Sequence, residues 1–82
     1  MIGDNVTIFQ NVTLGAKVNG EEYSAPIIGN NVVIGAGSCI LGDVKVGNNV
    51  KIGANSVVLT DIPDNCLAVG APAQIKKTEE LI

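Results

Sequence analysis

Among the side chains of types that commonly do chemistry, three groups stand out in this 82-residue sequence. Glu21, Glu22 and Tyr23 form one polar cluster, two cysteines stand far apart, and Lys76 and Lys77 form a basic pair near the end. The chain contains no histidine. A general base in this chain would therefore be a carboxylate, and Glu21 or Glu22 would suit only if burial raised its pKa.

The two cysteines, Cys39 and Cys66, predict neither a metal site nor a disulfide framework. They form no Cys-x-x-Cys pair, and no histidine is present to complete a zinc site. Free cysteine is often simply buried as a small apolar residue. We expect no metal, and the cysteine usage favours a reduced, cytoplasmic setting.

The elements that must position these groups follow from a six-residue repeat. An aliphatic residue returns every six positions, with one interruption between Leu14 and Ile28. Its members are Ile2, Ile8, Leu14, Ile28, Ile34, Ile40, Val46, Ile52 and Val58. A glycine usually follows, and two positions later comes a residue that tolerates a left-handed backbone. These residues are Asn5, Asn11, Asn31, Gly37, Asp43, Asn49, Asn55 and Asp61. Each hexad therefore predicts a very short strand followed by a tight turn.

Three hexads return the chain to its starting direction after 18 residues. The spacing predicts that Ile28 lies over Val46, Ile34 over Ile52 and Ile40 over Val58, in a continuous apolar stack. We therefore expect an all-β parallel helix of about three to four coils. The predicted organisation is a repeat region over residues 1–66 and a capping tail over residues 67–82.

Two segments break the repeat. The step from Ile2 to Ile28 is 26 residues, eight more than one 18-residue coil, which predicts an inserted loop over residues 16–27 on one face of the solenoid. This loop carries Glu21, Glu22 and Tyr23, and we expect it to shape a site or a subunit contact, although a merely solvated loop is the alternative. The turn at residues 61–65 ends the repeat. Residues 68–77 of the tail are expected to lie across the end of the coils, and residues 78–82 to form a single helical turn.

Charge and hydropathy exclude some classes of function. The net charge of −3 argues against a nucleic-acid surface, and no apolar run is long enough to span a membrane. No signal peptide is visible, because Met1 leads directly into the first hexad. A solenoid usually has a terminal cap. We therefore expect this chain to be the C-terminal part of a longer protein.

The hexads resemble those of the hexapeptide-repeat acyltransferases. Residues 8–15, IFQNVTLG, are similar to a segment of serine O-acetyltransferases, and residues 34–37, 52–58 and 69–73 are similar across the wider family. Residues 19–27 look closer to the galactoside and maltose acetyltransferases, and capsular-polysaccharide O-acetyltransferases share the pattern. The resemblance implies a left-handed parallel β-helix that transfers an acyl group from acetyl-CoA.

The same resemblance implies a homotrimer with acyl-CoA in a groove between two prisms. On this basis Ala36 and Ala54 line the pantetheine arm, Thr60 makes a further cofactor contact, and Lys77 lies near the nucleotide phosphates. Gln74 occupies another position at which relatives often carry a basic residue.

In the family a histidine takes the proton of the acceptor hydroxyl, and the alkoxide attacks the thioester. The resemblance places this histidine upstream of Met1, so we expect no catalytic residue within this chain. A second histidine of serine acetyltransferases corresponds to Ala25 here.

The sequence therefore predicts the cofactor-binding part of an O-acetyltransferase acting on serine or a saccharide hydroxyl, with Glu21, Glu22 and Tyr23 on the acceptor side. The alternative is a non-catalytic trimeric β-helix used as a scaffold or assembly module. The β-helical carbonic anhydrases are excluded for this chain, because their zinc needs three histidines.

Overall fold

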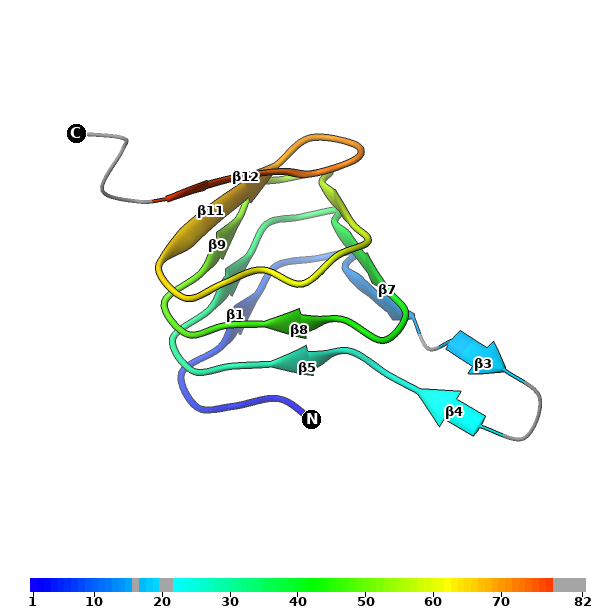
Figure 1. Ribbon diagram of the computed structural model, residues 1–82. Helices are drawn as coiled ribbons and strands as arrows, with labels where there is room; N and C mark the ends of the chain where they lie inside the picture. Colours follow the sequence, from blue (N-terminus) through cyan, green and yellow to red (C-terminus); the bar gives the residue numbers. More distant parts are fainter. Residues whose placement is uncertain (16, 20–21, 78–82) are drawn as a thin grey trace.

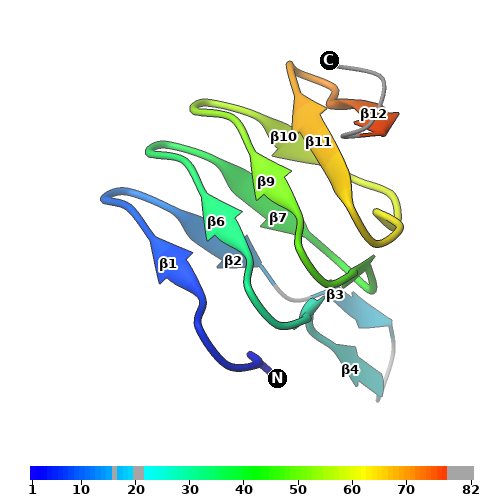
Figure 2. The ribbon, with the colours of Figure 1, turned by 90° about the vertical axis from the view of Figure 1, so that its left-hand side faces the viewer.

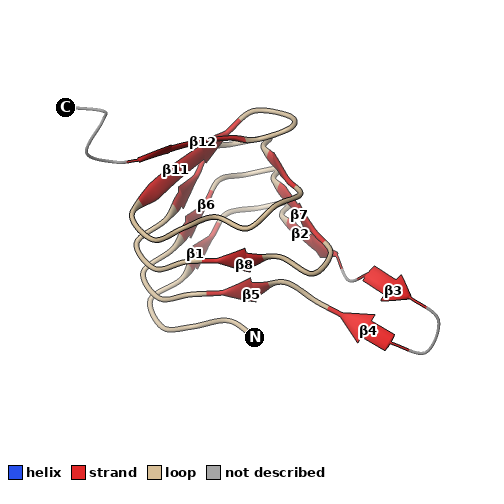
Figure 3. Ribbon diagram, in the orientation of Figure 1, coloured by secondary structure: helices blue, strands red, loops and turns tan. Residues whose placement is uncertain are grey.

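The computed structural model describes residues 1–15, 17–19 and 22–77, and within them it is built entirely from strands and turns (Figure 3). The strands are β1 (Thr7–Ile8), β2 (Thr13–Gly15), β3 (Lys17–Asn19), β4 (Glu22–Ser24), β5 (Ile27–Ile28), β6 (Val33–Ile34), β7 (Cys39–Leu41), β8 (Lys45–Val46), β9 (Lys51–Ile52), β10 (Val57–Val58), β11 (Cys66–Val69) and β12 (Gln74–Lys77). No helix capable of spanning a membrane occurs in the part of the chain that the structure describes.

Three parallel ladders form the three faces of a prism. One face pairs β1, β6, β9 and β11, the second pairs β2, β7 and β10, and the third pairs β5 with β8. In Figure 1 the chain runs leftward along the front face, backward along the left face and forward along the right face while it rises. These coils are therefore left-handed, as the resemblance implied.

The predicted aliphatic stack is confirmed in register. Ile28 pairs with Val46, Ile34 with Ile52 and Ile40 with Val58. The first coil joins the same stack, because Ile8 pairs with Ile34 across the insertion. The stacked side chains form the core together with the small or β-branched residue that follows each turn. Its buried members are Ile28, Val32, Ile34, Ile40, Val44, Val46, Val50, Ile52, Val58, Ile62, Cys66 and Ala68.

The last coil is shorter than the others. The six-residue spacing ends at Val58, but stacking continues, because Ile62 pairs with Val46 and Ala68 pairs with Ile52. Both pairs are separated by 16 residues rather than 18. The sequence pattern therefore shows where the spacing changes but not that the coil carries on. β11 begins at Cys66, where the repeat region was expected to end, and that boundary remains a prediction.

The tail folds back on this last coil. β12 pairs antiparallel with β11, from Val69 opposite Gln74 to Cys66 opposite Lys77, and extends the same sheet by one strand (Figure 2). This arrangement places β12 at the end of the prism, where a cap was expected. The helical turn expected over residues 78–82 lies outside the described residues.

The insertion contains a β-hairpin where the sequence predicted a loop. β3 and β4 pair antiparallel, with Val18 opposite Tyr23 and Asn19 opposite Glu22, and project sideways from the prism (Figure 1). An excursion that leaves and re-enters at one corner brings its two arms side by side, so they can satisfy each other's backbone groups. Ile27 already pairs with Lys45 in the regular coil.

Three corners join the faces, and they are named here by their residues. The asparagine corner comprises residues 4–5, 30–31, 48–49 and 64–65. The alanine corner comprises residues 10–11, 36–37, 54–55 and 70–72, and the third corner comprises residues 42–43 and 60–61 beside the hairpin. The left-handed residues at the first two corners are Asn5, Asn11, Asn31, Gly37, Asn49, Asn55, Asn65 and Gly70. At the third corner Gly42 takes the positive φ that the sequence pattern assigned to Asp43.

Candidate functional site

At the asparagine corner each coil satisfies the backbone of the coil before it. The amide of Asp4 donates to Oδ1 of Asn30 at 2.8 Å, and the amide of Asn30 donates to Oδ1 of Asn48 at 2.8 Å. The amide of Asn48 then donates to Oδ1 of Asp64 at 2.7 Å. A side-chain oxygen in every coil thus binds the exposed amide of the neighbouring coil.

At the alanine corner the same repeat position is occupied by Gln10, Ala36 and Ala54. Alanine has no side-chain oxygen, so Ala54 cannot accept from the amide of Ala36 as Asn48 accepts from the amide of Asn30. No described residue accepts a hydrogen bond from the amide of Ala36 or of Ala54. The two amides are thus open hydrogen-bond donors, stacked one coil apart.

The carbonyl oxygens of the two alanines differ. The Ala36 oxygen accepts from the amide of Asn55 at 2.9 Å, which joins the two coils. The Ala54 oxygen accepts from no described residue. The chain next passes this corner at residues 70–72, where the amide of Gly70 donates to the Ser56 hydroxyl at 3.2 Å and Pro72 has no N–H to donate. Ala54 is exposed and therefore offers both a donor and an acceptor from its backbone.

Two buried serines stand directly behind this corner. Ser38 and Ser56 are both 0 % exposed, and the hydroxyl of each donates to the carbonyl oxygen of Gly53 at 2.8 Å. The sequence pattern placed both serines among the small residues after the turn but gave them no role. The signal was present, since serine occupies this position only after Ala36 and Ala54.

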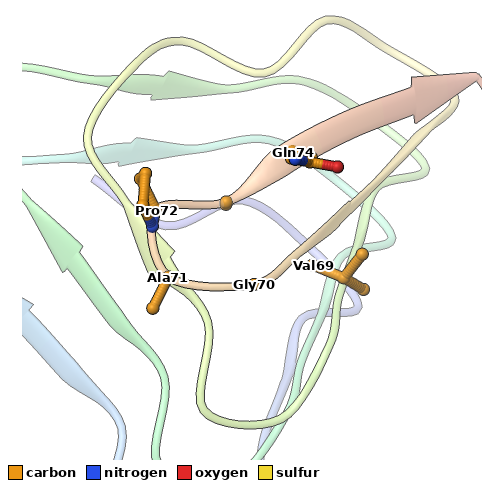
Figure 4. A pocket seen from close by; sticks show the side chains of 6 residues that line it. Val69, Gly70, Ala71, Pro72 and Gln74 are labelled. Atoms are coloured by element: carbon orange, nitrogen blue, oxygen red, sulfur yellow. The ribbon is translucent and has the colours of Figure 1, made fainter.

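A pocket opens at the top of the alanine corner, where the chain turns from β11 into β12. It has a volume of about 470 Å³ and is lined by Val69, Gly70, Ala71, Pro72, Ala73 and Gln74 (Figure 4). Gln74, whose position in relatives was expected near the nucleotide phosphates, lines this pocket and pairs with Val69. Ala73 donates its amide to the carbonyl of Val57 at 2.8 Å, which fixes this turn against β10.

The other predicted cofactor residues lie elsewhere in the prism. Thr60 is exposed at the third corner, next to Asp61, whose Oδ1 accepts from the amide of Lys45 at 2.8 Å. Lys77 is exposed at the far end of β12, opposite Cys66 and beside the asparagine corner. One copy of the chain thus brings Ala36 and Ala54 together, and it does not bring Thr60 or Lys77 to them.

The predicted acceptor-side residues belong to the hairpin. Glu22 and Tyr23 lie in β4, and Glu21 lies outside the described residues. Ala25 is half-buried and Pro26 is buried where the hairpin rejoins the prism. The hairpin leaves the prism near the third corner, so it is separated by one face from the alanine pair (Figure 1).

The described residues bring together no group of three side chains suited to a metal ion. The open features of the alanine corner are instead backbone donors, one backbone acceptor and small side chains. Such a surface suits a narrow, uncharged arm with amide groups, because only small residues let it approach the backbone closely.

The repeats that build this fold belong to a known class, because residues 25–60 match the family model described as bacterial transferase hexapeptide (six repeats). The chain belongs to this family of hexapeptide-repeat transferases. Within it the chain is a homologue of serine acetyltransferases. It is 54% identical over 78 residues to the serine acetyltransferase of Staphylococcus epidermidis. The aligned residues cover 95% of this chain and 37% of that relative.

Solved structures of serine acetyltransferases share the fold. That of Neisseria gonorrhoeae has a TM-score of 0.83 at 43% identity, over 88% of this chain and 28% of that one. That of Brucella abortus in complex with coenzyme A has a TM-score of 0.82 at 44% identity, over 89% of this chain and 29% of that one. The N. gonorrhoeae protein is also known in complex with serine. The chain spans less than two fifths of the length of each of these relatives.

Proposed function

We propose that this chain forms the CoA-binding part of an acetyl-CoA-dependent serine O-acetyltransferase. In the reaction the hydroxyl oxygen of serine attacks the thioester carbonyl of acetyl-CoA. The C–S bond breaks, the acetyl group moves to oxygen, and the hydroxyl proton leaves through a general base to balance the CoA thiolate. A saccharide hydroxyl is the alternative acceptor.

The observation that carries the proposal is the open backbone of the alanine corner. The pantetheine arm of CoA contains two amides, each with one N–H and one C=O. Ala54 offers a matching N–H and C=O, and Ala36 offers a second N–H one coil away. The spacing of neighbouring parallel strands, about 4.8 Å, is close to the separation of the two amides along that arm.

The pocket beside this corner extends the proposed site. Gly70 has no side chain at its wall, and Gln74 adds a polar side chain to the lining (Figure 4). We assign to this pocket the part of CoA beyond the pantetheine arm. The relatives solved with CoA and with serine support both halves of the proposed reaction.

The proposal assigns the general base to a histidine outside these 82 residues, because the sequence contains none. Histidine suits the task since its pKa lies near neutral pH. Within the chain we assign the acceptor side to the hairpin that carries Glu21, Glu22 and Tyr23. Its separation from Ala54 is compatible with a site completed by a second copy of the chain.

We further propose that the protein is a cytoplasmic homotrimer with the CoA groove between neighbouring prisms. Three-fold packing would bring one corner of each prism against a different corner of the next. This would account for Thr60 and Lys77 as cofactor contacts although they lie at other corners. Leu41 and Leu59, 39 % and 54 % exposed on one face, supply apolar surface suited to such a contact.

Isothermal titration of the purified chain with CoA tests the proposal, with molecular mass measured by light scattering on the same sample. We expect saturable binding at one CoA per protomer in a trimer, and competition by pantetheine. A folded trimer that binds neither CoA nor pantetheine would contradict the proposal and leave the scaffold function in its place.

A further inference from the structure

The two serines behind the alanine corner are unusual for this core. The equivalent position after the other turns carries a β-branched aliphatic or cysteine. Its occupants are Val6, Val12, Val32, Val44, Val50, Ile62 and Cys66. A buried hydroxyl is costly unless it is hydrogen-bonded, and valine fits the same place without that cost. Ser38 and Ser56 therefore call for an explanation other than packing.

Both hydroxyls bind the same atom, the carbonyl oxygen of Gly53. Ser56 reaches it from three residues along the same coil, and Ser38 reaches it from the coil before, each at 2.8 Å. Two donors from different directions fix this carbonyl more tightly than one would. Because both serines are fully buried, the Gly53 carbonyl points toward the core.

The other end of that peptide unit is the amide of Ala54. A trans peptide is planar, and its N–H points opposite to its C=O. With the Gly53 oxygen held toward the core, the Ala54 N–H is directed away from it, and no described residue accepts from it. Hydrogen bonds to the carbonyl also polarise the peptide and strengthen its N–H as a donor.

Ser56 also connects this peptide to the pocket. Its hydroxyl oxygen accepts from the amide of Gly70 at 3.2 Å, and the Gly70 carbonyl accepts from the amide of Val57 at 2.9 Å. Gly70 lines the pocket at the top of the corner. One buried hydroxyl thus holds both the open amide of Ala54 and the turn beside it.

We propose that Ser38 and Ser56 are positioning residues for CoA. They act through the Gly53–Ala54 peptide, which they orient so that its N–H faces the pantetheine arm, and Ser56 also sets the pocket wall at Gly70. This inference rests on the proposed function, since it assumes that CoA occupies the alanine corner.

A matched pair of variants at Ser56 tests the inference. Thr and Val have the same shape, and Val already occupies this repeat position at Val12 and Val50, so both Ser56→Thr and Ser56→Val should fit. Only Thr keeps the hydroxyl. We expect Ser56→Thr to bind CoA within about twofold of the parent chain and Ser56→Val to bind about tenfold more weakly, the effect of one hydrogen bond.

Two further measurements separate positioning from stability. The ¹H–¹⁵N resonance of Ala54 should shift in Ser56→Val without ligand and stay near its parent position in Ser56→Thr. Val50→Ala, which leaves a small cavity behind the asparagine corner, should lower the urea midpoint and leave the dissociation constant for CoA unchanged.

Equal CoA affinity in Ser56→Val and Ser56→Thr would overturn the inference while the proposed function stands. A parent chain that is folded but binds no CoA would overturn the proposed function, and the inference with it. An affinity that follows the urea midpoint across all three variants would show that the serines act only through stability.

Discussion

The asparagine corner and the alanine corner are built on the same backbone and treat it in opposite ways. Both follow an aliphatic–glycine pair, and both turn through a left-handed residue, with φ of 57° at Asn49 and at Asn55. At the first corner a side-chain oxygen of each coil binds the amide of the coil before it. At the second, alanine leaves that amide open.

The difference shows how a repeat protein can obtain a binding site without changing its fold. Replacing one asparagine per coil by alanine removes a hydrogen bond between coils and creates a donor for a ligand. The loss is local, because the aliphatic stack holds both corners in register. The same repeat position thus contributes to stability at the asparagine corner and to binding at the alanine corner. Placing asparagine at the alanine corner, or alanine at the asparagine corner, should therefore exchange these two contributions.

The largest effect is expected from converting the alanine corner into an asparagine corner with Ala54→Asn. Neither Gly35 nor Gly29 has a Cβ. At Gly29, Oδ1 of Asn48 lies 2.6 Å from the place that a Cβ would take. By analogy with Asn48, whose Oδ1 accepts from the amide of Asn30, we expect Oδ1 of the new side chain to accept from the amide of Ala36. Titration should show CoA binding weakened about a hundredfold, since a donor is lost and the groove is narrowed.

The same variant should not lose stability. Urea unfolding should give a free energy of unfolding unchanged or raised by about 0.5–1.5 kcal/mol, the contribution of one added hydrogen bond. Weaker CoA binding together with unchanged or higher stability distinguishes a specific change at this corner from partial unfolding of the protein. If Ala54→Asn kept the CoA affinity of the parent chain, the assignment of the alanine corner to the CoA site would be wrong.

The reverse change, Asn48→Ala, should give an intermediate effect at the asparagine corner. It leaves the amide of Asn30 without its acceptor and should lower the free energy of unfolding by about 1 kcal/mol, measured in urea. CoA affinity should stay within twofold of the parent, because this corner lies away from Ala54. A loss of CoA affinity comparable to that of Ala54→Asn would show that the two corners are not independent.

The smallest effect is expected where the corners are alike. Asn49→Gly and Asn55→Gly each keep a residue that adopts positive φ freely, so each should change the free energy of unfolding by less than about 0.5 kcal/mol. Asn49→Ala and Asn55→Ala, which strain the left-handed turn, should each cost about 1 kcal/mol. Thermal melts of the four variants test this expectation. A different loss of stability at Asn49 and at Asn55 for the same substitution would show that the two corners do not share one backbone conformation.

The stacking of the coils was predictable because it depends on sequence period alone. Eighteen residues separate Ile34 from Ile52 and Ile40 from Val58, so one constant spacing predicts the stack of the regular coils. The continuation at Ala68 escaped this reasoning, since a coil two residues shorter breaks the period while keeping the stack. The hairpin was missed because strand pairing within an insertion depends on how its two ends meet.

The candidate site was predictable only in part. Ala36 and Ala54 stand out as small residues one coil apart, and the structure brings them together. The sequence alone could not show that the amides of Ala36 and Ala54 are open. They are open because no described residue places an acceptor oxygen in hydrogen-bonding geometry with either amide. The role inferred for Ser38 and Ser56 depends on which carbonyl their hydroxyls reach, and only coordinates show that. Thr60 and Lys77 remain predictions that depend on a second copy.

The antiparallel strand β12 also affects how molecules can meet end to end. A solenoid whose last coil were bare would present a parallel edge able to accept another coil, and successive copies could add into a fibre. β12 covers that edge on the face that ends in β11, with a strand of opposite direction whose exposed residues include Lys76 and Lys77. Reversed direction and positive charge make this face a poor template for a further parallel coil.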